Sequence, residues 1–268
     1  MKLSVITINR NNRNGLEKTL RSIYPLDSNI SDQVEHIIID GDSTDGSVDL
    51  IREYSTKYGL TWTSEKDSGI FNAMNKGLDK ITGEYVIFMN SGDVFCENIL
   101  GSSLFTELDG NDVVYGNIYV NQGARLTHVN QTDELDFLYM IGKTICHQSV
   151  FMKSSLCKKY KFVEDSQFSL MGDWIQLFDM LRNEQLIVKK INQDICVYDA
   201  DGVSDKIDGL RQHQRLVYLK KYYGSWELNQ FKELSRLRNR KYYRLFVNSL
   251  TSYKATVCLN FISKWILR

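Results

Sequence analysis

Residues 34–47 read VEHIIIDGDSTDGS, an apolar run that stops abruptly at small and acidic residues. A second boundary of this kind lies at residues 85–93, which read YVIFMNSGD. Both apolar runs are continuous, as is typical of strands covered on both faces of a sheet. In an open α/β sheet, ligands bind in the crevice outside such strand ends. The two boundaries therefore predict one crevice that could hold a nucleotide and a divalent metal.

Strand-like and helix-like patterns alternate along the chain. Short apolar runs predict strands at residues 3–8, 34–39, 60–64, 85–89, 113–120, 125–129, 187–191 and 195–198. Apolar residues at helical spacing predict helices at residues 14–23, 45–54, 70–81, 97–108, 135–141 and 171–181, and almost throughout from 205 onward. Asp45 is the expected N-cap of the second of these helices. The alternation predicts an α/β fold, with a mainly parallel sheet flanked by helices.

The composition is that of an ordinary globular protein, with 43% hydrophobic and 25% charged residues among 268. This length fits one large domain, or one domain with an appended C-terminal segment. The five cysteines show no metal-binding or redox spacing, so we expect reduced thiols and a cytoplasmic location. The N-terminus enters a strand-like run at once, which is unlike a secretory signal.

The formal net charge of zero conceals a basic C-terminal end. Residues 220–268 hold eleven basic and two acidic residues, so this part carries +9 and residues 1–219 carry −9. Residues 240–268 show an apolar stripe at helical spacing flanked by basic residues. This pattern predicts peripheral contact with an anionic membrane, at the inner face of the cytoplasmic membrane. The alternative is a helix that packs on the catalytic body or on another subunit.

Five motifs are spaced along the first part of the chain: Thr7-Ile8-Asn9, the run 40–46, the run SEKDSGIFNAMNKG at 64–77, the run TGEY at 82–85 and the run NSGD at 90–93. Together they resemble the family 2 glycosyltransferases, which are inverting enzymes of the GT-A fold. The 64–77 run is similar to a bacterial branch that assembles surface polysaccharides of the colanic acid, O-antigen or capsule type. The resemblance is dense over residues 3–93 and looser to about 205.

This resemblance implies a division of the chain. Residues 1–205 would form the GT-A catalytic domain, a Rossmann-like, mainly parallel sheet flanked by helices. Within it, residues 1–95 would be the nucleotide-binding half and residues 96–205 the acceptor-binding half. Residues 206–268 would be a basic helical C-terminal extension. Gly202-Val203-Ser204 resembles a loop that closes over the donor in relatives.

The nucleotide-binding residues follow from the same resemblance. A carboxylate at the end of the second strand can accept the imide hydrogen of uracil, and Asp40 is placed to do so. The alternative for Asp40 is a simple turn former. Asp67 resembles the position that contacts the base or the ribose. The full set of expected nucleotide contacts is Thr7, Asn9, Asp40, Asp67 and Asp93.

Asp93 also matches the last aspartate of the metal-binding motif of the family. Mg²⁺ or Mn²⁺ held there would bridge the donor's phosphates and stabilise the charge of the leaving diphosphate. The acids that precede this aspartate in the family are replaced by Asn90 and Gly92. Only one carboxylate remains, so the metal would depend more on phosphate oxygens, water and other groups.

The catalytic base is expected in the second half of the chain. An inverting transfer requires a carboxylate that takes the proton of the acceptor hydroxyl. The family places it at a helix start, and Asp173 matches that position. The alternative is a helix-start acid favoured by the helix dipole. His147, Gln148 and Trp174 are candidate contacts of the acceptor or the diphosphate, with structural roles as the alternative.

These observations favour an enzyme that moves a sugar from a nucleotide-sugar, with UDP as the expected nucleotide, to a glycan or lipid-linked glycan acceptor in bacterial cell-surface polysaccharide biosynthesis. Two alternatives keep the same fold. A sugar nucleotidyltransferase is disfavoured because the loop after the first strand has one glycine, Gly15, where such enzymes carry a glycine-rich loop. A non-catalytic nucleotide-binding or scaffold protein gains weight from Asn90 and Gly92. A nucleic-acid partner is not expected, because the crevice is acidic.

Overall fold

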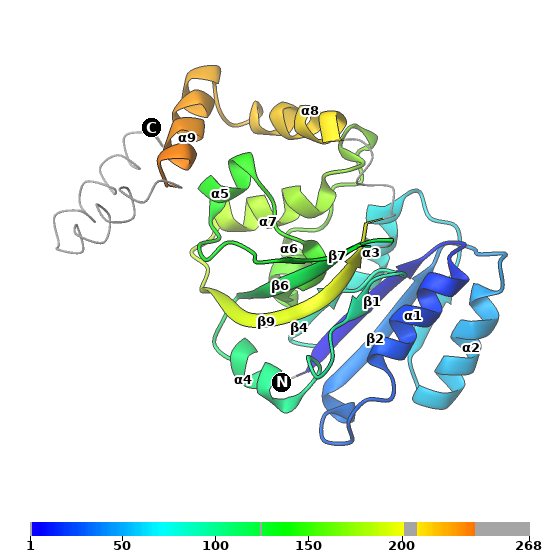
Figure 1. Cartoon of the computed structure of the whole chain (residues 1–268). Coiled ribbons are helices and arrows are strands. Elements are labelled where there is room, and N and C mark those ends of the chain that lie inside the picture. Colours follow the sequence, from blue (N-terminus) through cyan, green and yellow to red (C-terminus); the bar gives the residue numbers. More distant parts are fainter. Residues whose placement is uncertain (1, 124, 201–207, 239–268) are drawn as a thin grey trace.

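The computed structural model describes residues 2–123, 125–200 and 208–238. Within them one nine-stranded sheet has the order β3-β2-β1-β4-β8-β6-β9-β5, and β7 pairs with β6 (Figure 1). The strands are β1 Leu3–Asn9, β2 Val34–Asp40, β3 Thr61–Ser64, β4 Tyr85–Phe88, β5 Val94–Phe95, β6 Val113–Gln122, β7 Arg125–Val129, β8 Val150–Lys153 and β9 Val188–Asp199.

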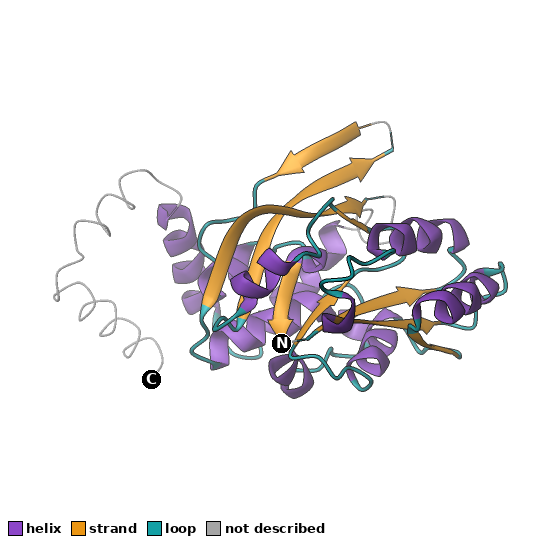
Figure 2. Cartoon of the chain, turned by 90° about the horizontal axis from the view of Figure 1, so that it is seen from below, coloured by secondary structure: helices purple, strands orange, loops and turns teal. Residues whose placement is uncertain are grey.

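Helices lie on both sides of this sheet (Figure 2). They are α1 Arg13–Ile23, α2 Ser47–Tyr58, α3 Ile70–Leu78, α4 Ser102–Leu108, α5 Phe137–Gly142, α6 Ser154–Lys159, α7 Gly172–Asn183, α8 Asp208–Leu219 and α9 Ser225–Arg238. Three short 3₁₀ turns occur at η1 Ser31–Gln33, η2 His147–Ser149 and η3 Ser166–Phe168. The predicted α/β fold with flanking helices is confirmed.

Strand β2 shows why both faces of the sheet are covered. Ile38 packs with residues of α1 and α2, whereas Ile37 and Ile39 belong to the core cluster of the other face, which includes Phe71 and Met74 of α3. Successive side chains of a strand point to opposite faces, so a continuous apolar run serves two helical layers at once.

The parallel part of the sheet places the site. Strands β1, β2, β3 and β4 run parallel, and Asn9, Asp40 and Ser64 lie in register at the ends of the first three. The second half of the sheet is mixed, because β8 runs antiparallel to both β4 and β6, whereas β6 and β9 are parallel. The carboxyl ends of β1, β2 and β3 therefore meet at one edge.

Three sequence-based boundaries need correction. The strands expected at 187–191 and 195–198 are one strand, β9, whose pairing with β6 shifts register around Asn117. The helix expected from residue 97 begins only at Ser102. Asp45 is not the N-cap of α2; Gly46 is, and Asp45 instead accepts hydrogen bonds from Ser47 and from the backbone N–H of Arg13.

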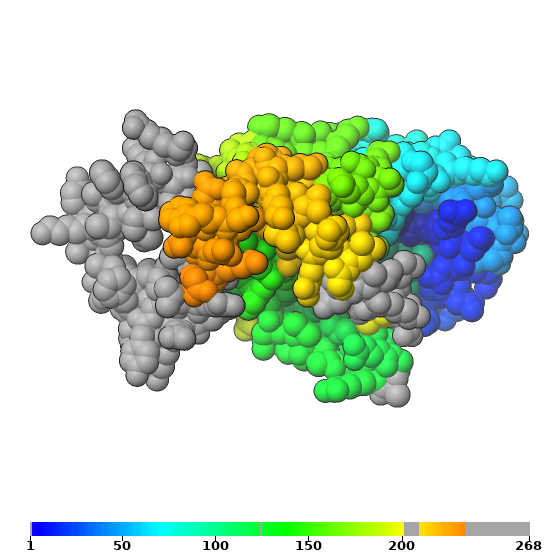
Figure 3. All heavy atoms as spheres, turned by 90° about the horizontal axis from the view of Figure 1, so that it is seen from above, coloured from blue at the N-terminus to red at the C-terminus, as the bar shows by residue number. Residues whose placement is uncertain are grey.

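The first helices beyond residue 205 pack on the second half of the chain. Tyr218 and Leu219 of α8 and Leu228 and Phe231 of α9 are buried in the same core cluster as Trp174 of α7. Figure 3 shows α8 (yellow) and α9 (orange) lying against the green surface of that half. The segment 240–268, for which membrane contact was predicted, lies outside the described residues. No helix within the described ranges combines the length and the apolar content that a membrane span requires.

Glu35 fixes the turn before β4. Its carboxylate accepts hydrogen bonds from Ser4 Oγ at 2.5 Å, Thr82 N at 2.6 Å and Gly83 N at 2.8 Å, and it pairs with Lys2 at 2.8 Å. Burial raises the pKa of Glu35, but the hydrogen bonds from Lys2, Ser4 and Thr82 outweigh it and hold this pKa at about 2.

Glu35→Gln is therefore expected to lower the free energy of unfolding at pH 7 by about 1 kcal/mol, a value reduced for solvent screening. The folded pKa lies below the unfolded value of 4.5, so the contribution is complete above pH 4.5 and is lost as the pH falls toward 2. Urea unfolding at pH 7 and pH 3 would measure it. Glu53→Gln, an exposed change on α2, is the control. A difference between Glu35→Gln and wild type that is larger at pH 3 than at pH 7 would contradict this account.

Candidate active site

Asp40 organises the ends of the first three strands. It is fully buried, and its Oδ1 accepts from Asn9 Nδ2 at 2.8 Å. Its Oδ2 accepts from Ser64 Oγ at 2.7 Å and from the backbone N–H of Ser43 at 2.9 Å. Both oxygens are thus engaged in joining β1, β2 and β3. Asp40 therefore links the carboxyl ends of the three strands by hydrogen bonds. Its direct contact with a base stays a prediction.

Two other predicted nucleotide residues are enclosed on β1, Asn9 at the end of the strand and Thr7 two positions before it, with its hydroxyl directed toward the start of β2. Thr7 is fully buried, and its hydroxyl lies 2.9 Å from His36 Nε2 in the next strand. Asn9 is 4% exposed, and its amide nitrogen is shared between Asp40 and Ser43 Oγ, which lies at 3.3 Å. The side-chain oxygen of Asn9 is buried without a hydrogen-bond partner. Of the side-chain polar atoms of Thr7 and Asn9, this oxygen is the one that could still accept a hydrogen bond from a ligand.

Asp67 lies beside the glycine that follows Asp40. A Cβ placed on Gly41 would stand 3.0 Å from Asp67 Oδ2 and 3.2 Å from Arg10 Cδ, so a larger residue at 41 would displace one of them. Lys76 Nζ donates to Asp67 Oδ1 at 2.8 Å and also pairs with Glu65 at 2.8 Å. Gly41 therefore makes room for a carboxylate from the third strand end. The structure brings Asp67 to the same edge as Asp40, as predicted.

Asp93 belongs to the second predicted strand end, in the segment that follows β4 along the chain. It is 4% exposed, and its Oδ1 accepts the backbone N–H of Asp199 at 2.9 Å. Burial raises the pKa of Asp93 to about 7, with a further rise from the charge of Asp199 and an opposing effect of hydrogen bonds from Asp199 and the Gln148 side chain. Gln148 also accepts from Cys146 Sγ at 3.2 Å. Gln148 therefore lies beside Asp93, whereas its predicted contact with the acceptor or the diphosphate stays a prediction.

Asp199, at the end of β9, is a site residue that sequence reasoning missed. A Cβ placed on Gly92 would lie 3.6 Å from Asp199 Oδ2 and 3.6 Å from Asn12 Nδ2. The Asp199 carboxylate therefore lies within van der Waals distance of position 92. The local sequence offered no signal for this, because Asp199 is 106 residues away from Asp93. The acids absent at 90 and 92 are in this way partly replaced in space.

The donor set of this region fits a divalent metal of the Mg²⁺ or Mn²⁺ type. Two carboxylates, Asp93 and Asp199, come from different strand ends, and carboxylate oxygens are the ligands that these ions prefer. Among the described residues no group of three or more histidine, cysteine or acidic side chains is arranged to hold a metal on its own. Such an ion would therefore complete its coordination with phosphate oxygens and water.

Asp173 lies in the first turn of α7, where its Oδ1 accepts the N–H of Trp174 at 2.8 Å. Trp174 is 2% exposed, stacks on Phe178 at 4.8 Å, and donates its indole N–H to Met140 O at 2.8 Å. The indole of Trp174 therefore joins α7 to α5 as a core residue. Its predicted contact with the acceptor stays a prediction.

The turn η2 links the two predicted carboxylates. Gln148 reaches Asp93, while the preceding residue, His147, borders a cavity of about 10 Å³ that Asp173 also lines. His147 is 7% exposed and stacks on Phe88, with ring centroids 4.9 Å apart. The predicted site residues from the two halves of the chain therefore meet around one short turn.

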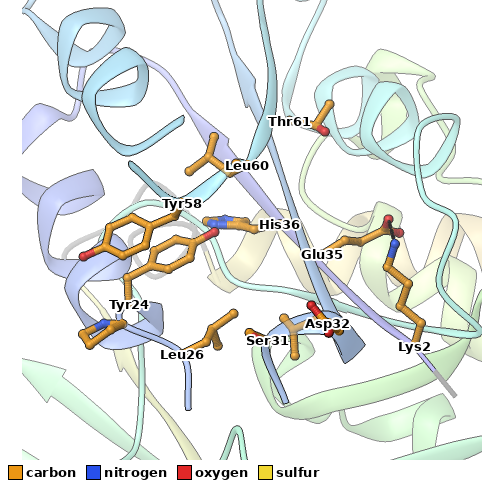
Figure 4. A pocket seen from close by; sticks show the side chains of 13 residues that line it. Lys2, Tyr24, Leu26, Ser31, Asp32, Glu35, His36, Tyr58, Leu60 and Thr61 are labelled. Atoms are coloured by element: carbon orange, nitrogen blue, oxygen red, sulfur yellow. Dashed lines mark ion pairs between the residues drawn. The ribbon is translucent and has the colours of Figure 1, made fainter. Parts of the chain in front are cut away.

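A larger cavity, of about 460 Å³, lies at the opposite ends of the strands (Figure 4). It is lined by the beginnings of β2 and β3 and by the stacked rings of Tyr24 and Tyr58, whose centroids are 4.3 Å apart. None of the predicted site residues lines it. Lys2 and Glu35 point toward one another there, in the ion pair that anchors Thr82. This cavity is larger than the one beside Asp173, but the predicted site residues lie elsewhere.

Known structures share this fold. Residues 1–349 of S. aureus TarS in complex with UDP match with a TM-score of 0.67 and 19% identity, over 89% of this chain and 71% of that one. The mannosyltransferase PcManGT of Pyrobaculum calidifontis, in complex with GDP-Man and Mn²⁺, matches with a TM-score of 0.57 and 14% identity, over 92% of this chain and 83% of that one. These likenesses confirm the predicted GT-A fold.

Sequence relatives are bacterial glycosyltransferases. The chain is 36% identical over 207 residues to an uncharacterized glycosyltransferase of Mycobacterium tuberculosis, covering 75% of this chain and 76% of that one. It is 25% identical over 174 residues to a PGL/p-HBAD biosynthesis glycosyltransferase of the same species, covering 63% of this chain and 66% of that relative's length. The sequence profile described as "Glycosyl transferase family 2" matches residues 4–162, the segment that carries Asp40, Asp67, Asp93 and Gln148. Because this match spans more than half of the chain, the chain belongs to glycosyl transferase family 2.

Proposed function

We propose that this glycosyltransferase moves a sugar from a UDP-sugar, with inversion, to a hydroxyl of a lipid-linked glycan used in a bacterial surface polysaccharide. The observation that carries the proposal is the turn η2, because it holds Gln148 against Asp93 and His147 beside Asp173. The consecutive residues His147 and Gln148 thereby connect Asp93, the proposed carboxylate on the donor side, with Asp173, the proposed carboxylate on the acceptor side. That arrangement suits a reaction in which one group stabilises the leaving diphosphate and another activates the incoming hydroxyl.

The reaction is a single displacement. The acceptor oxygen bonds to the anomeric carbon of the sugar, while the bond from that carbon to the diphosphate oxygen breaks. The proton of the acceptor hydroxyl passes to the Asp173 carboxylate, and the nucleoside diphosphate leaves with the electron pair. Asp173, in the first turn of α7, acts as the general base. No covalent intermediate with the enzyme forms.

The base and ribose of the donor would lie at the edge set by Asp40. Asp67, admitted by Gly41, and the partnerless oxygen of Asn9 are the polar atoms available there. Support for a donor that carries a nucleoside diphosphate comes from the TarS structures, which hold UDP or UDP-GlcNAc, and from PcManGT, which holds GDP-Man. A uracil is proposed here because a carboxylate can accept its imide hydrogen.

Asp93 and Asp199 would hold Mg²⁺ or Mn²⁺ together with the phosphates. The ion, when bound, supplies positive charge that stabilises the leaving diphosphate. Gln148 keeps the Asp93 carboxylate oriented by a hydrogen bond, and the backbone N–H of Asp199 does the same from the other strand end. PcManGT in its complex with Mn²⁺ offers a parallel from the same fold.

A panel of nucleotide-sugars tests this function. The purified protein is incubated with UDP-, GDP- and dTDP-sugars, with Mn²⁺ or with a chelator, and release of nucleoside diphosphate is measured. We expect a UDP-sugar to give the fastest release and to raise the melting temperature. The chelator is expected to remove both effects. Fastest release from GDP- or dTDP-sugars would overturn the choice of donor, and an equal rate in chelator would overturn the metal.

Membrane contact through residues 240–268 is a separate part of the proposal. These residues combine an apolar stripe with six basic side chains, each worth about 1 kcal/mol near an anionic surface. Truncation after Arg238, which leaves α9 in place, is expected to lower partitioning onto anionic vesicles at low salt by more than about tenfold. Neutral vesicles are the control. If the truncated and full-length proteins sediment equally with anionic vesicles, the segment packs on protein instead.

A further inference from the structure

His147 is buried in an apolar setting with both ring nitrogens unpartnered. It is 7% exposed, stacks on Phe88 at 4.9 Å and meets the edge of Phe162 at 5.6 Å. Neither Nδ1 nor Nε2 has a hydrogen-bond partner. An unpaired buried polar atom destabilises the folded protein, so phenylalanine would serve better than histidine at this position if packing were its only role.

The small cavity beside this ring is shared with Asp173. Its volume of about 10 Å³ is close to the smallest space that holds one water molecule. Three polar side chains line it besides the indole, namely His147, Asp173 and Thr144. The Thr144 hydroxyl donates to Ile145 O at 3.1 Å, and the Trp174 indole N–H donates to Met140 O. A molecule in the cavity would therefore form its hydrogen bonds with the imidazole of His147 and the carboxylate of Asp173.

We propose that His147 is a positioning residue for Asp173, and that it acts through one water molecule held in this cavity between the imidazole and the carboxylate. The proposal rests on the proposed function, in which Asp173 takes the proton of the acceptor hydroxyl. It differs from the sequence-based expectation that His147 contacts the acceptor or the diphosphate, since the ring is enclosed by Phe88 and Phe162.

The imidazole acts as a neutral group. Burial lowers the pKa of His147, and the charge of Asp173 opposes this only in part. A neutral ring can donate from one nitrogen and accept at the other. Its hydrogen bond to the water, passed on to Asp173, restricts the rotation of the carboxylate. The proton from the acceptor stays on Asp173, and His147 does not take it.

His147→Phe separates positioning from packing. Phenylalanine fits between two aromatic rings and removes both unpartnered nitrogens, so the melting temperature is expected to be unchanged or higher. Affinity for UDP with Mn²⁺ is expected to stay within about twofold, while kcat for transfer falls by about 10- to 100-fold. His213→Phe, the same change at an exposed position of α8, is the control. Transfer at the wild-type rate by a folded His147→Phe protein would overturn the proposal.

Two further measurements keep the test decisive. If His147→Phe does not fold, His147→Gln and His147→Leu are compared, and Gln is expected to keep the higher kcat because its amide can still bond to the water. Equal rates, or a higher rate for Leu, contradict the proposal.

Combining His147→Phe with Asp173→Asn should lower kcat no further than Asp173→Asn alone, because both changes act on one step. Independent, multiplying losses would show that His147 acts elsewhere. Full transfer by Asp173→Asn alone would instead overturn the proposed base.

Discussion

Replacing Asp173 with asparagine is expected to lower kcat for sugar transfer by about 10²- to 10⁴-fold, while UDP binding with Mn²⁺ stays unchanged. Asparagine keeps the shape of the side chain and can still accept the N–H of Trp174. It cannot take a proton from the acceptor hydroxyl. The loss should therefore appear in the transfer step, and not in the affinity for the donor.

The control must address the alternative that Asp173 only favours the start of α7. Asp136 provides it, because it caps α5 and accepts the N–H of Tyr139 at 2.8 Å. Asparagine caps a helix about as well as aspartate, so Asp136→Asn should leave both stability and transfer near wild type. A similar loss of transfer in both variants, accompanied by a lower melting temperature, would assign Asp173 a structural role. Transfer by Asp173→Asn at the wild-type rate would exclude it as the base.

The sequence predicts the first half of the fold well because its elements are specified locally. A buried parallel strand needs apolar residues for both faces, so β1, β2 and β4 are visible as continuous runs. Strand β9 was split in the prediction because its middle residues are only partly buried, and its continuity comes from pairing with β6. Non-local pairing of this kind leaves little trace in a short window of sequence.

The candidate site shows the same division between residues that local motifs identify and contacts that only the folded chain creates. Asp40, Asp93 and Asp173 could be selected from their motifs, whereas the position of Gln148 beside Asp93 is visible only in the structure. The burial of Asp40 under three donors could not be foreseen, since two of them, Asn9 and Ser64, come from neighbouring strands. Asp199 was missed because only the folded sheet brings the end of β9 to Gly92. The argument for a non-catalytic protein, which depended on missing acids, loses weight with Asp199 in place.

Asp93→Asn is expected to abolish Mn²⁺-dependent binding of UDP and, at the same time, to stabilise the ligand-free protein. The two effects have one cause, which is a carboxylate 4% exposed in a site that we propose to hold a cation. Burial raises the pKa of Asp93 from 3.8 to about 7. The folded protein then holds this proton more tightly than the unfolded chain does, so the contribution of Asp93 to stability falls as the pH rises from about 4 to 7.

At pH 8 the ionised Asp93 costs about 2–4 kcal/mol, and asparagine removes this cost because it never ionises. Denaturant unfolding of both proteins at pH 5 and pH 8, without metal, should show a larger gain for Asp93→Asn at pH 8. Calorimetric titration with UDP and Mn²⁺ should show no metal-dependent binding for this variant. Asp199→Asn, the matched change on the other strand end, is expected to weaken metal-dependent binding of UDP by about tenfold without abolishing it. A variant at Asp93 that loses stability but still binds UDP with Mn²⁺ would show that this carboxylate serves the fold, and that the metal is held elsewhere.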